Sequence, residues 1–353
     1  MAHPVKVRRD TRNAREVNRL EFGLRHENSP MKLRSSGLAS AIAVTLFCAA
    51  TCLAQTYPAR AIRVVVPFAP GGGTDILTRT IAPRLGEALG QQLVIDNRAG
   101  GGSTIGSEMV SKAVADGYTL LMVDTSFTTN PSLYTRLPYD SARDFAPVSL
   151  MAAAPVILIV HPSVPVRTVK EFVTLAKAKP GQLNFASGGP GSSTHLGGEL
   201  LKLVAAIDLV HIPYKGTGPA VADVLGGQVV MMFAGISSIK QHVAVGRLRA
   251  IAVTGDKRSP AMPEVPTFVE SGLKGVDSGT YWGCLAPAAT PKDIVNKLST
   301  TIAAVLKLPD IQPRLIDLGF DPIGGSPEQF TANIKGETEK WARVIKSAGV
   351  KLD

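Results

Sequence analysis

The sequence predicts an α/β fold built from two domains. Short runs of β-branched residues recur along the chain, each followed by a Gly/Ser-rich loop and then by a segment with apolar residues three or four positions apart. The runs are apolar throughout, which is typical of strands in parallel sheets that helices cover on both faces. About ten such strands occur in the 353 residues, more than one compact sheet usually holds, so we expect two domains.

The first unit of this pattern lies at 63–89. The strand at 63–66 leads through PFAPGGGTD to a predicted helix, for which Thr74 or Asp75 would serve as N-cap and in which Pro83 would introduce a kink. Its apolar residues recur at every fourth position: Leu77, Ile81, Leu85 and Leu89.

The pattern then continues to the end of the chain. Residues 93–106 lead into a helix that ends near Ala115, and residues 118–130 form a strand that ends in hydroxyl residues. The remaining expected elements are a strand at 156–162, a helix near 168–178, strand–loop–helix units at 183–204 and 209–227, strands at 229–234, 248–254 and 280–287, and helices at 291–306 and 327–348. Doubly wound sheets bind ligands at the carboxyl ends of their strands, where these loops would lie.

Residues 31–55 have the layout of a secretory signal peptide. Met31, a possible start, is followed by two basic residues, an apolar stretch and then small residues. We therefore expect 31–54 to be a signal peptide removed after Ala54, and 1–30 to be a non-translated or disordered extension. The alternatives are a membrane anchor, for which the stretch is short, and a basic arm that binds nucleic acid.

Charge and cysteine content support an exported protein without disulfides. Half of the net charge of +10 lies in residues 1–34, so the rest of the chain is only mildly basic. Aromatic residues make up 5% of the chain, which leaves few stacking surfaces for bases. Removal of the signal leaves Cys284 as the single cysteine, which excludes an intrachain disulfide and indicates a core residue.

Each Gly/Ser loop ends at a predicted helix N-terminus. Such an end presents unpaired N–H groups and the positive end of the helix dipole. Several of these ends together would form a site that binds an anion through uncharged donors. Hydroxyls such as those of Thr125, Ser126 and 192–194 would add to the N–H groups. For any single loop, a tight turn without a ligand explains the glycines as well.

Known nucleotide and catalytic motifs are absent from the sequence. Neither G-x-G-x-x-G at the three glycines nor G-x-x-x-x-G-K-[ST] occurs, so no nucleotide cofactor is expected. G-x-S-x-G and H-E-x-x-H are also missing. His195 and Glu199 could share a metal, and Ser192 with His195 could form a nucleophile pair, but more often such residues only share a helix face. We therefore expect a binding protein without cofactor or metal rather than an enzyme.

The mature chain resembles the substrate-binding proteins of tripartite tricarboxylate transporters, the Bug family of periplasmic solute-binding proteins. The segments that carry the resemblance are YPARAIRVVVPFAPGGGTD (57–75), GQQLVIDNRAGGGSTIG (90–106), ADGYTLL (115–121), NPSLYTRLPYD (130–140), DFAPVSL (144–150), FASGGPGSSTHLGGE (185–199), IPYKGTGPAVADVLGGQV (212–229), LRAIAVT (248–254), PEVPTFVESGL (263–273) and WGCLAPAATP (282–291).

This resemblance implies the two-lobed type II periplasmic binding protein fold, whose lobes close on a small organic carboxylate. We expect chain crossings near Pro155 and Gly279, which would give one lobe at 57–155 plus 280–353 and the other at 156–279. The expected ligand-binding residues are Phe68, Ala69, Gly71, Gly72, Gly73, Thr74, Asp75, Thr125, Ser126, Ser187, Gly188, Ser192, Ser193, Thr194, His195, Tyr214 and Ala234.

The resemblance also implies partners: an organic anion and the subunits of a membrane permease, but no nucleic acid. The anion would be a di- or tricarboxylate, an aromatic carboxylate or an amino acid. An alternative output is signalling, with the protein docking on a sensor kinase. The family commonly carries acids where this chain has Val230 and Ala234. If these two positions face the cleft, the site lacks a negative charge that its relatives carry and would favour ligands without an amine. If the acids of the relatives are structural, their absence here says nothing about the ligand.

Overall fold

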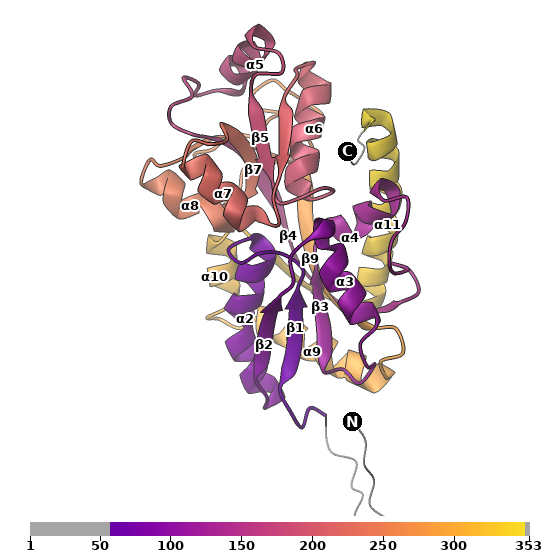
Figure 1. Ribbon diagram of the computed structural model, residues 1–353. Coiled ribbons are helices and arrows are strands. Elements are labelled where there is room, and N and C mark those ends of the chain that lie inside the picture. The colour runs from indigo at the N-terminus through magenta and orange to yellow at the C-terminus, as the bar shows by residue number, and fades with distance from the viewer. Residues whose placement is uncertain (1–56, 350–353) are drawn as a thin grey trace, which may run out of the picture. The chain divides into compact units, whose positions relative to one another are not determined.

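The computed structural model describes residues 57–349, which belong to one compact unit (Figure 1). The predicted extension at 1–30 and signal peptide at 31–54 lie outside the described residues. Within 57–349, no helix is both long enough and apolar enough to cross a membrane.

The strands join in one ten-stranded mixed sheet. Its order is β2-β1-β3-β9-β4-β7-β5-β6, and β8 and β10 also pair with β4. The strand bounds are β1 Ile62–Val66, β2 Leu93–Asn97, β3 Thr119–Val123, β4 Phe145–Val160, β5 Asn184–Ser187, β6 Val210–Pro213, β7 Met231–Gly235, β8 Arg249–Val253, β9 Gly279–Pro287 and β10 Asp321–Gly325. The α/β class predicted from the sequence is confirmed.

Helices flank both halves of this sheet (Figure 1). Their bounds are α2 Gly73–Leu89, η1 Gly101–Ser103, α3 Thr104–Ser111, α4 Ser126–Leu133, α5 Val169–Ala178, α6 Ser193–Ala205, α7 Thr217–Leu225, α8 Ile236–Ala244, α9 Lys292–Leu306, α10 Gln312–Asp317 and α11 Pro327–Ala348. In the first half, β1 is parallel to β2 and β3, and its buried residues pack with those of α2 and α9 in one core cluster. In the second half, β5 is parallel to β6 and β7.

Two long strands connect the halves. Residues 145–155 of β4 pair antiparallel with β9, with Pro155 opposite Gly279. From Val156 onward β4 pairs instead with β7 and β8. The pairing therefore changes at the positions where we expected the crossings. The division into lobes at these positions stays a prediction, because 57–349 lie within one compact unit.

The region 118–130 differs from the sequence prediction. The strand ends at Val123, and residues from Ser126 onward form α4 instead of continuing as a strand. Thr128 and Thr129, which favour strands by propensity, donate their hydroxyls to the carbonyls of Thr125 and Ser126 at 2.9 and 3.1 Å. These local bonds and the packing of α4 on α11 outweigh the β-branched preference.

Three other expectations also need correction. The N-cap of α2 is Gly72 rather than Thr74 or Asp75, because both of those side chains bond elsewhere. Helix α3 ends at Ser111, short of Ala115. Sequence reasoning also missed α10, β10 and the first part of β4. The strand at 280–287 and the helices at 168–178, 291–306 and 327–348 are confirmed within one residue.

Candidate functional site

Five helix N-termini meet around one small cavity between the two halves of the sheet. The cavity has a volume of about 30 Å³, close to the space of one water molecule. Each of five helices contributes a residue from its start: α2, α6, α7 and α8 contribute the N-cap or a residue of the first turn. Helix α4 contributes Asp124, which directly precedes its N-cap. The lining residues are Phe68, Gly72, Gly73, Thr74, Asp124, Val156, Gly188, Ser192, Ser193, Thr194, Thr217, Gly235, Thr280 and Trp282.

The glycine run at 71–73 forms the start of α2. Gly72 is the N-cap, and the first-turn N–H groups of Gly73 and Thr74 have no acceptor among the described residues. A Cβ on Gly73 would lie 2.6 Å from Trp282, so this position needs glycine to keep the helix end against the indole. Trp282 is itself held in place, since its Nε1 donates to the Thr74 hydroxyl at 3.0 Å. The run therefore places two free donors at the cavity.

The start of α6 supplies a second pair of free donors. The N–H groups of Ser193 and Thr194 have no acceptor within the described part of the chain. The hydroxyls that we expected to hold a ligand are already engaged. Ser192 Oγ donates to the Gly189 carbonyl at 2.7 Å and accepts from His195 N–H, and Thr194 Oγ1 accepts from Gly188 N–H at 2.8 Å. Backbone N–H groups are thus the free donors of this loop, and its hydroxyls hold its shape.

Direct hydrogen bonds join the loops across the cavity. Ala69 N–H donates to the Lys215 carbonyl at 2.9 Å, and Ser238 Oγ donates to the Gly71 carbonyl at 3.0 Å. Thr129 Oγ1 donates to the Gly191 carbonyl at 2.8 Å. These three bonds connect residues before 155 with residues after 156, so the described conformation is closed around the cavity.

Asp124 is the one charged side chain among the residues that line the cavity. It follows β3 directly, and its Oδ1 accepts from Ser126 N–H at 2.9 Å, which caps the start of α4. Burial raises the pKa of this carboxyl to about 6. Sequence reasoning missed it, although its place between a buried strand and Thr125-Ser126 was a usable signal.

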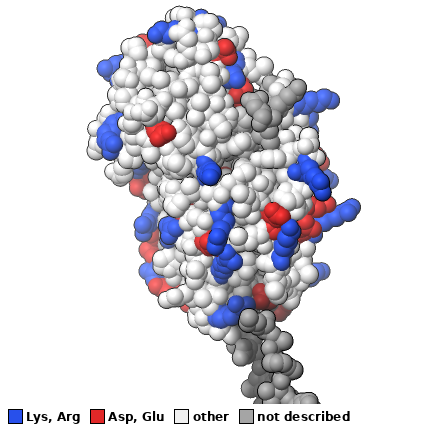
Figure 2. Space-filling model, in the orientation of Figure 1, with Lys and Arg blue, Asp and Glu red and all other residues white. Residues whose placement is uncertain are grey.

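The electrostatics of the cavity come from the backbone. None of its lining residues is Lys, Arg or His, so the positive potential must come from helix N-termini. On the outer face shown in Figure 2, basic side chains are scattered and interspersed with acidic ones rather than gathered in a patch.

Several of the predicted residues lie beside the cavity without lining it. Asp75 is buried. Burial alone would raise its pKa, but hydrogen bonds from Arg79, from Gly71 N–H and from Asn97 outweigh this and lower it. Asp75 therefore anchors the glycine loop. Ala69 and Gly71 take part in the bonds across the cavity, and Thr125 Oγ1 lies 3.4 Å from the Gly279 carbonyl. Ser126 is buried, and its Oγ has no hydrogen-bond partner within residues 57–349.

Ser187, His195 and Tyr214 support the loops from behind. Ser187 Oγ lies 2.6 Å from His211 Nε2, and the rings of His195 and His211 stack with centroids 4.0 Å apart. Burial lowers the pKa of His195 to about 3, so it is neutral, and its Nδ1 accepts from Gly191 N–H. Tyr214 donates its hydroxyl to Asp223 at 2.5 Å. None of the three lines the cavity.

The geometry does not support the metal and nucleophile readings of this helix. His195 Nε2 lies 3.9 Å from Glu199 Oε1, and Glu199 is held by Lys202 at 3.0 Å. No group of three or more potential metal ligands occurs among the described residues. The hydroxyl of Ser192 bonds to the backbone of His195 rather than to its ring.

Val230 and Ala234 do not face the cavity. Ala234 is fully buried in a core cluster and pairs with Ile157, and Val230 packs partly buried against another cluster. The condition under which missing acids at these positions would shape the site is therefore not met in the described conformation, and the one acid that lines the cavity, Asp124, comes from a different element.

Other lining residues were also missed. Val156 and Thr280 lie where the chain crosses between the halves, Gly235 is the N-cap of α8 and pairs with Val156, and Thr217 begins α7. The loop before Thr217 repeats the Gly-rich pattern that marked the other loops, so it could have been found. Trp282 lies inside a predicted strand, and nothing in the local sequence distinguishes it from a core residue.

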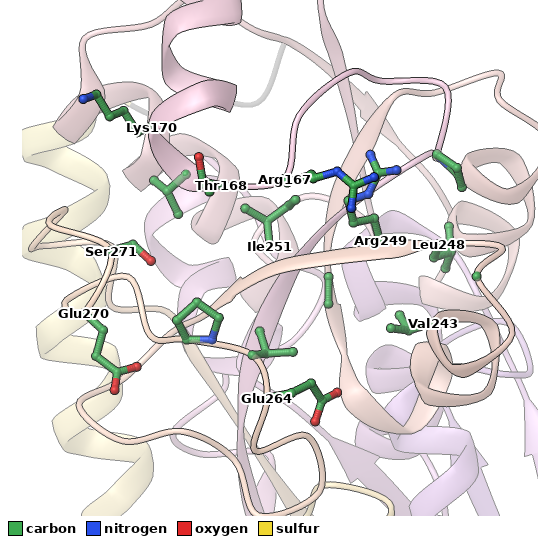
Figure 3. A pocket seen from close by; sticks show the side chains of 16 residues that line it. Arg167, Thr168, Lys170, Val243, Leu248, Arg249, Ile251, Glu264, Glu270 and Ser271 are labelled. Atoms are coloured by element: carbon green, nitrogen blue, oxygen red, sulfur yellow. The ribbon is translucent and has the colours of Figure 1, made fainter.

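A larger groove lies elsewhere, on the second half of the sheet. It has a volume of about 760 Å³, and Figure 3 shows Arg167, Arg249, Glu264 and Glu270 among its lining residues. Two of these side chains are already engaged by the protein: Arg249 donates to the carbonyls of Val164 and Val166, and Glu270 forms an ion pair with Arg258 at 2.8 Å. The small central cavity, with its free donors, is therefore the candidate ligand site.

Comparison with known proteins gives consistent results. The model of the tripartite tricarboxylate transporter family receptor matches residues 77–350. A protein encoded in the tcbD-tcbE intergenic region of Pseudomonas sp. strain P51 is 41% identical over 82% of this chain and 87% of its own length. The protein BugT of Bordetella pertussis is 36% identical over 86% of this chain and 94% of its own.

Solved structures agree with this assignment. The periplasmic binding protein BugD is 37% identical, with a TM-score of 0.81 over 84% of this chain and 99% of its own. A Rhodopseudomonas palustris protein solved with adipate is 36% identical, with a TM-score of 0.82 over 84% of this chain and 99% of its own. MatC of the same organism, solved with bound malate, is 33% identical, with a TM-score of 0.78 over 82% and 100%.

These matches confirm the family, the periplasmic binding protein fold and the non-enzymatic class that the sequence indicated. The chain belongs to the tripartite tricarboxylate transporter receptor family, the Bug-type periplasmic solute-binding proteins.

Proposed function

We propose that this protein captures a small organic carboxylate between the loops around the central cavity, which must widen from its described volume of about 30 Å³ to hold the ligand, and delivers it to the membrane permease of a tripartite tricarboxylate-type transporter. The carboxylate would accept hydrogen bonds from the N–H groups of Gly73 and Thr74 on one side and from those of Ser193 and Thr194 on the other.

The convergence of five helix N-termini on a cavity without cationic side chains carries this proposal. Helix N-termini favour anions, and their N–H groups form charge-assisted bonds to carboxylate oxygens. The chain has no nucleotide motif, so a nucleotide phosphate is not the expected anion. Adipate and malate in the two Rhodopseudomonas palustris relatives are carboxylates, which supports the same ligand class here.

The connection between the halves fits a capture mechanism. Two strands cross at Pro155–Val156 and at Gly279, and few bonds across the cavity would need to break for it to open. A ligand that bonds to both α2 and α6 would favour the closed arrangement. Under this proposal the lobes are 57–155 plus 280–353 and 156–279, and the ligand is buried between them.

Export to the periplasm through the segment at 31–54 is part of the proposal. The family match and the similarity to the periplasmic binding protein BugD support this export. Protein recovered from the periplasm should begin at Gln55. Mass analysis that finds residues 1–30 on the exported protein would contradict this.

Calorimetry with a panel of mono-, di- and tricarboxylates, aromatic carboxylates and amino acids tests the binding function. We expect at least one carboxylate to bind with a dissociation constant in the micromolar range or below and to raise the melting temperature. Failure of every carboxylate to bind would refute the proposal.

Uptake measurements separate transport from signalling. If the protein feeds a permease, deletion of its gene should abolish uptake of the labelled ligand while leaving transcriptional responses to that ligand intact. Loss of the transcriptional response with normal uptake would instead indicate docking on a sensor kinase.

A further inference from the structure

Asp124 places a carboxylate inside a site that otherwise donates to anions. It is the one charged side chain that lines the cavity, and its Oδ1 is occupied by Ser126 N–H at 2.9 Å. It forms no ion pair with any Lys, Arg or His of residues 57–349, although the Ser126 side chain and the N–H of Asp124 itself also lower its pKa without outweighing burial. An acid in such surroundings is costly to keep ionised unless a ligand or solvent donates to it.

The neighbouring titratable groups cannot supply a counter-charge. On α2, Asp75 is engaged by Arg79 and Asn97, and on α6, His195 is buried and neutral. On β9, the pKa of the buried Tyr281 is raised strongly, first by burial and also by the charges of Asp124 and of Glu337 on α11. On α8, the Lys240 ammonium is bonded to Asp317. Among the described residues, no cation therefore pairs with the Asp124 carboxylate, which can accept a further hydrogen bond from a ligand.

Resting on the proposed function, we propose that Asp124 is a specificity-determining residue that selects a carboxylate bearing a hydrogen-bond donor, an amino or hydroxyl group, against the matching unsubstituted acid. The ligand carboxylate accepts from α2 and α6, and its amino or hydroxyl group donates to Asp124 Oδ2. A plain dicarboxylate would bring a second anionic group near the Asp124 carboxylate, and its binding would require Asp124 to be protonated.

The proposal gives opposite pH dependences for the two ligand classes. Burial raises the pKa of Asp124 to about 6, so between pH 6 and pH 8 its protonated fraction falls from about one half to about one hundredth. Affinity for an unsubstituted dicarboxylate should therefore fall up to about 50-fold over this range. Affinity for an amino acid should hold or rise, because the ionised carboxylate is the form that pairs with an ammonium.

Matched acids test this directly by calorimetry. The probes are succinate, malate and aspartate, which differ only in the group on one carbon, and the longer set glutarate, 2-hydroxyglutarate and glutamate. At pH 8 we expect the substituted members of the set that binds to be about 10- to 100-fold tighter than the unsubstituted member. In Asp124→Asn this preference should collapse, with the unsubstituted acid gaining affinity and losing its pH dependence.

Two further variants complete the design. Asp116→Asn is the matched control, because Asp116 Oδ1 accepts from the N–H two residues on, that of Tyr118, at 3.0 Å, as Asp124 does from Ser126. Asp116 does not line the cavity, so this variant should bind ligands like the wild type. Asp124→Ser keeps a hydroxyl acceptor for Ser126 N–H and replaces the asparagine variant if that fails to fold.

Each outcome bears on a different statement. Equal or tighter binding of the unsubstituted acid by the wild type at pH 8, or an unchanged preference in the Asp124 variants, would overturn the role of Asp124 while leaving the solute-binding function standing. Absence of binding by every carboxylate, in the wild type and in the variants, would refute the proposed function and this inference together.

Discussion

Replacement of Gly72 by aspartate should abolish ligand binding without harming the fold. Gly72 is the N-cap of α2 and has φ −87° and ψ 168°, a conformation open to any residue. A Cβ built there meets its nearest neighbour, Thr217 Cβ, at 3.4 Å, an ordinary contact. Aspartate caps a helix a few tenths of a kcal/mol better than glycine, but it also adds a second carboxylate to the cavity that Asp124 lines, so the variant should stay folded with a lower melting temperature than the wild type at pH 8.

The new carboxylate would compete with the ligand in two ways. It would enter a cavity of only about 30 Å³ and accept the same first-turn N–H groups of α2. It would also repel the ligand carboxylate: two unit charges about 4 Å apart at an effective dielectric constant near 20 repel by about 4 kcal/mol. This corresponds to a roughly thousandfold loss of affinity.

The control is Gly72→Asn, which has the same shape and capping ability but no charge. Calorimetry with whichever carboxylate the wild type binds should show a loss at least 100-fold greater for the aspartate variant than for the asparagine variant. If both variants bind like the wild type, the start of α2 does not contact the ligand and the proposed site is wrong. Equal losses in both would show that bulk rather than charge blocks the site.

Three further changes test the packing around the site. Ser192→Ala combined with Thr194→Ala should lower the free energy of unfolding by roughly 1–2 kcal/mol, since these hydroxyls cap α6 and bond Gly188 N–H; an unchanged urea midpoint would contradict this. Asp124→Asn should raise stability at pH 8 by up to about 3 kcal/mol but not at pH 4, because burial raises the native pKa of Asp124 to about 6, above the ordinary aspartate value of about 3.9, so the stability of the wild type falls as pH rises through this window. Equal effects at both pH values, measured by denaturant titration, would contradict this. Gly198→Ala should cost roughly 1–3 kcal/mol because its Cβ would lie 2.2 Å from the Phe185 ring, whereas Gly336→Ala, in open space on α11, should gain up to about 1 kcal/mol; similar melting temperatures for the two variants would contradict this packing.

The sequence was informative about the fold because its signals were local. Runs such as 64–66 and 156–160 are apolar throughout, and loops rich in glycine mark helix starts, so most strands and helices could be placed within a few residues. The exceptions were elements set by tertiary contacts. Helix α4 forms against the β-branched preference of Thr128 and Thr129 because their hydroxyls bond to the preceding turn and the helix packs on α11.

The site could be predicted only in part for the same reason. Glycine runs at 71–73 and 188–191 marked the loops, and the structure places Gly72, Gly73, Ser193 and Thr194 around one cavity. Which atoms of these residues remain free depends on bonds that the sequence does not reveal. The hydroxyls of Ser192 and Thr194 are used within their own loop, while Asp124, which looked like the end of a strand, is the charged group that faces the cavity.

The amide NMR shifts of the first turns of α2 and α6 test the central claim most directly. Addition of the carboxylate that binds in the calorimetric panel should move the amide protons of Gly73, Thr74, Ser193 and Thr194 downfield, as expected for N–H groups that donate to an anion. The amides of Glu264, Glu270 and Ser271, which line the large groove of Figure 3, should stay unchanged. Unchanged shifts at the four amides, with changes confined to the large groove, would contradict the account.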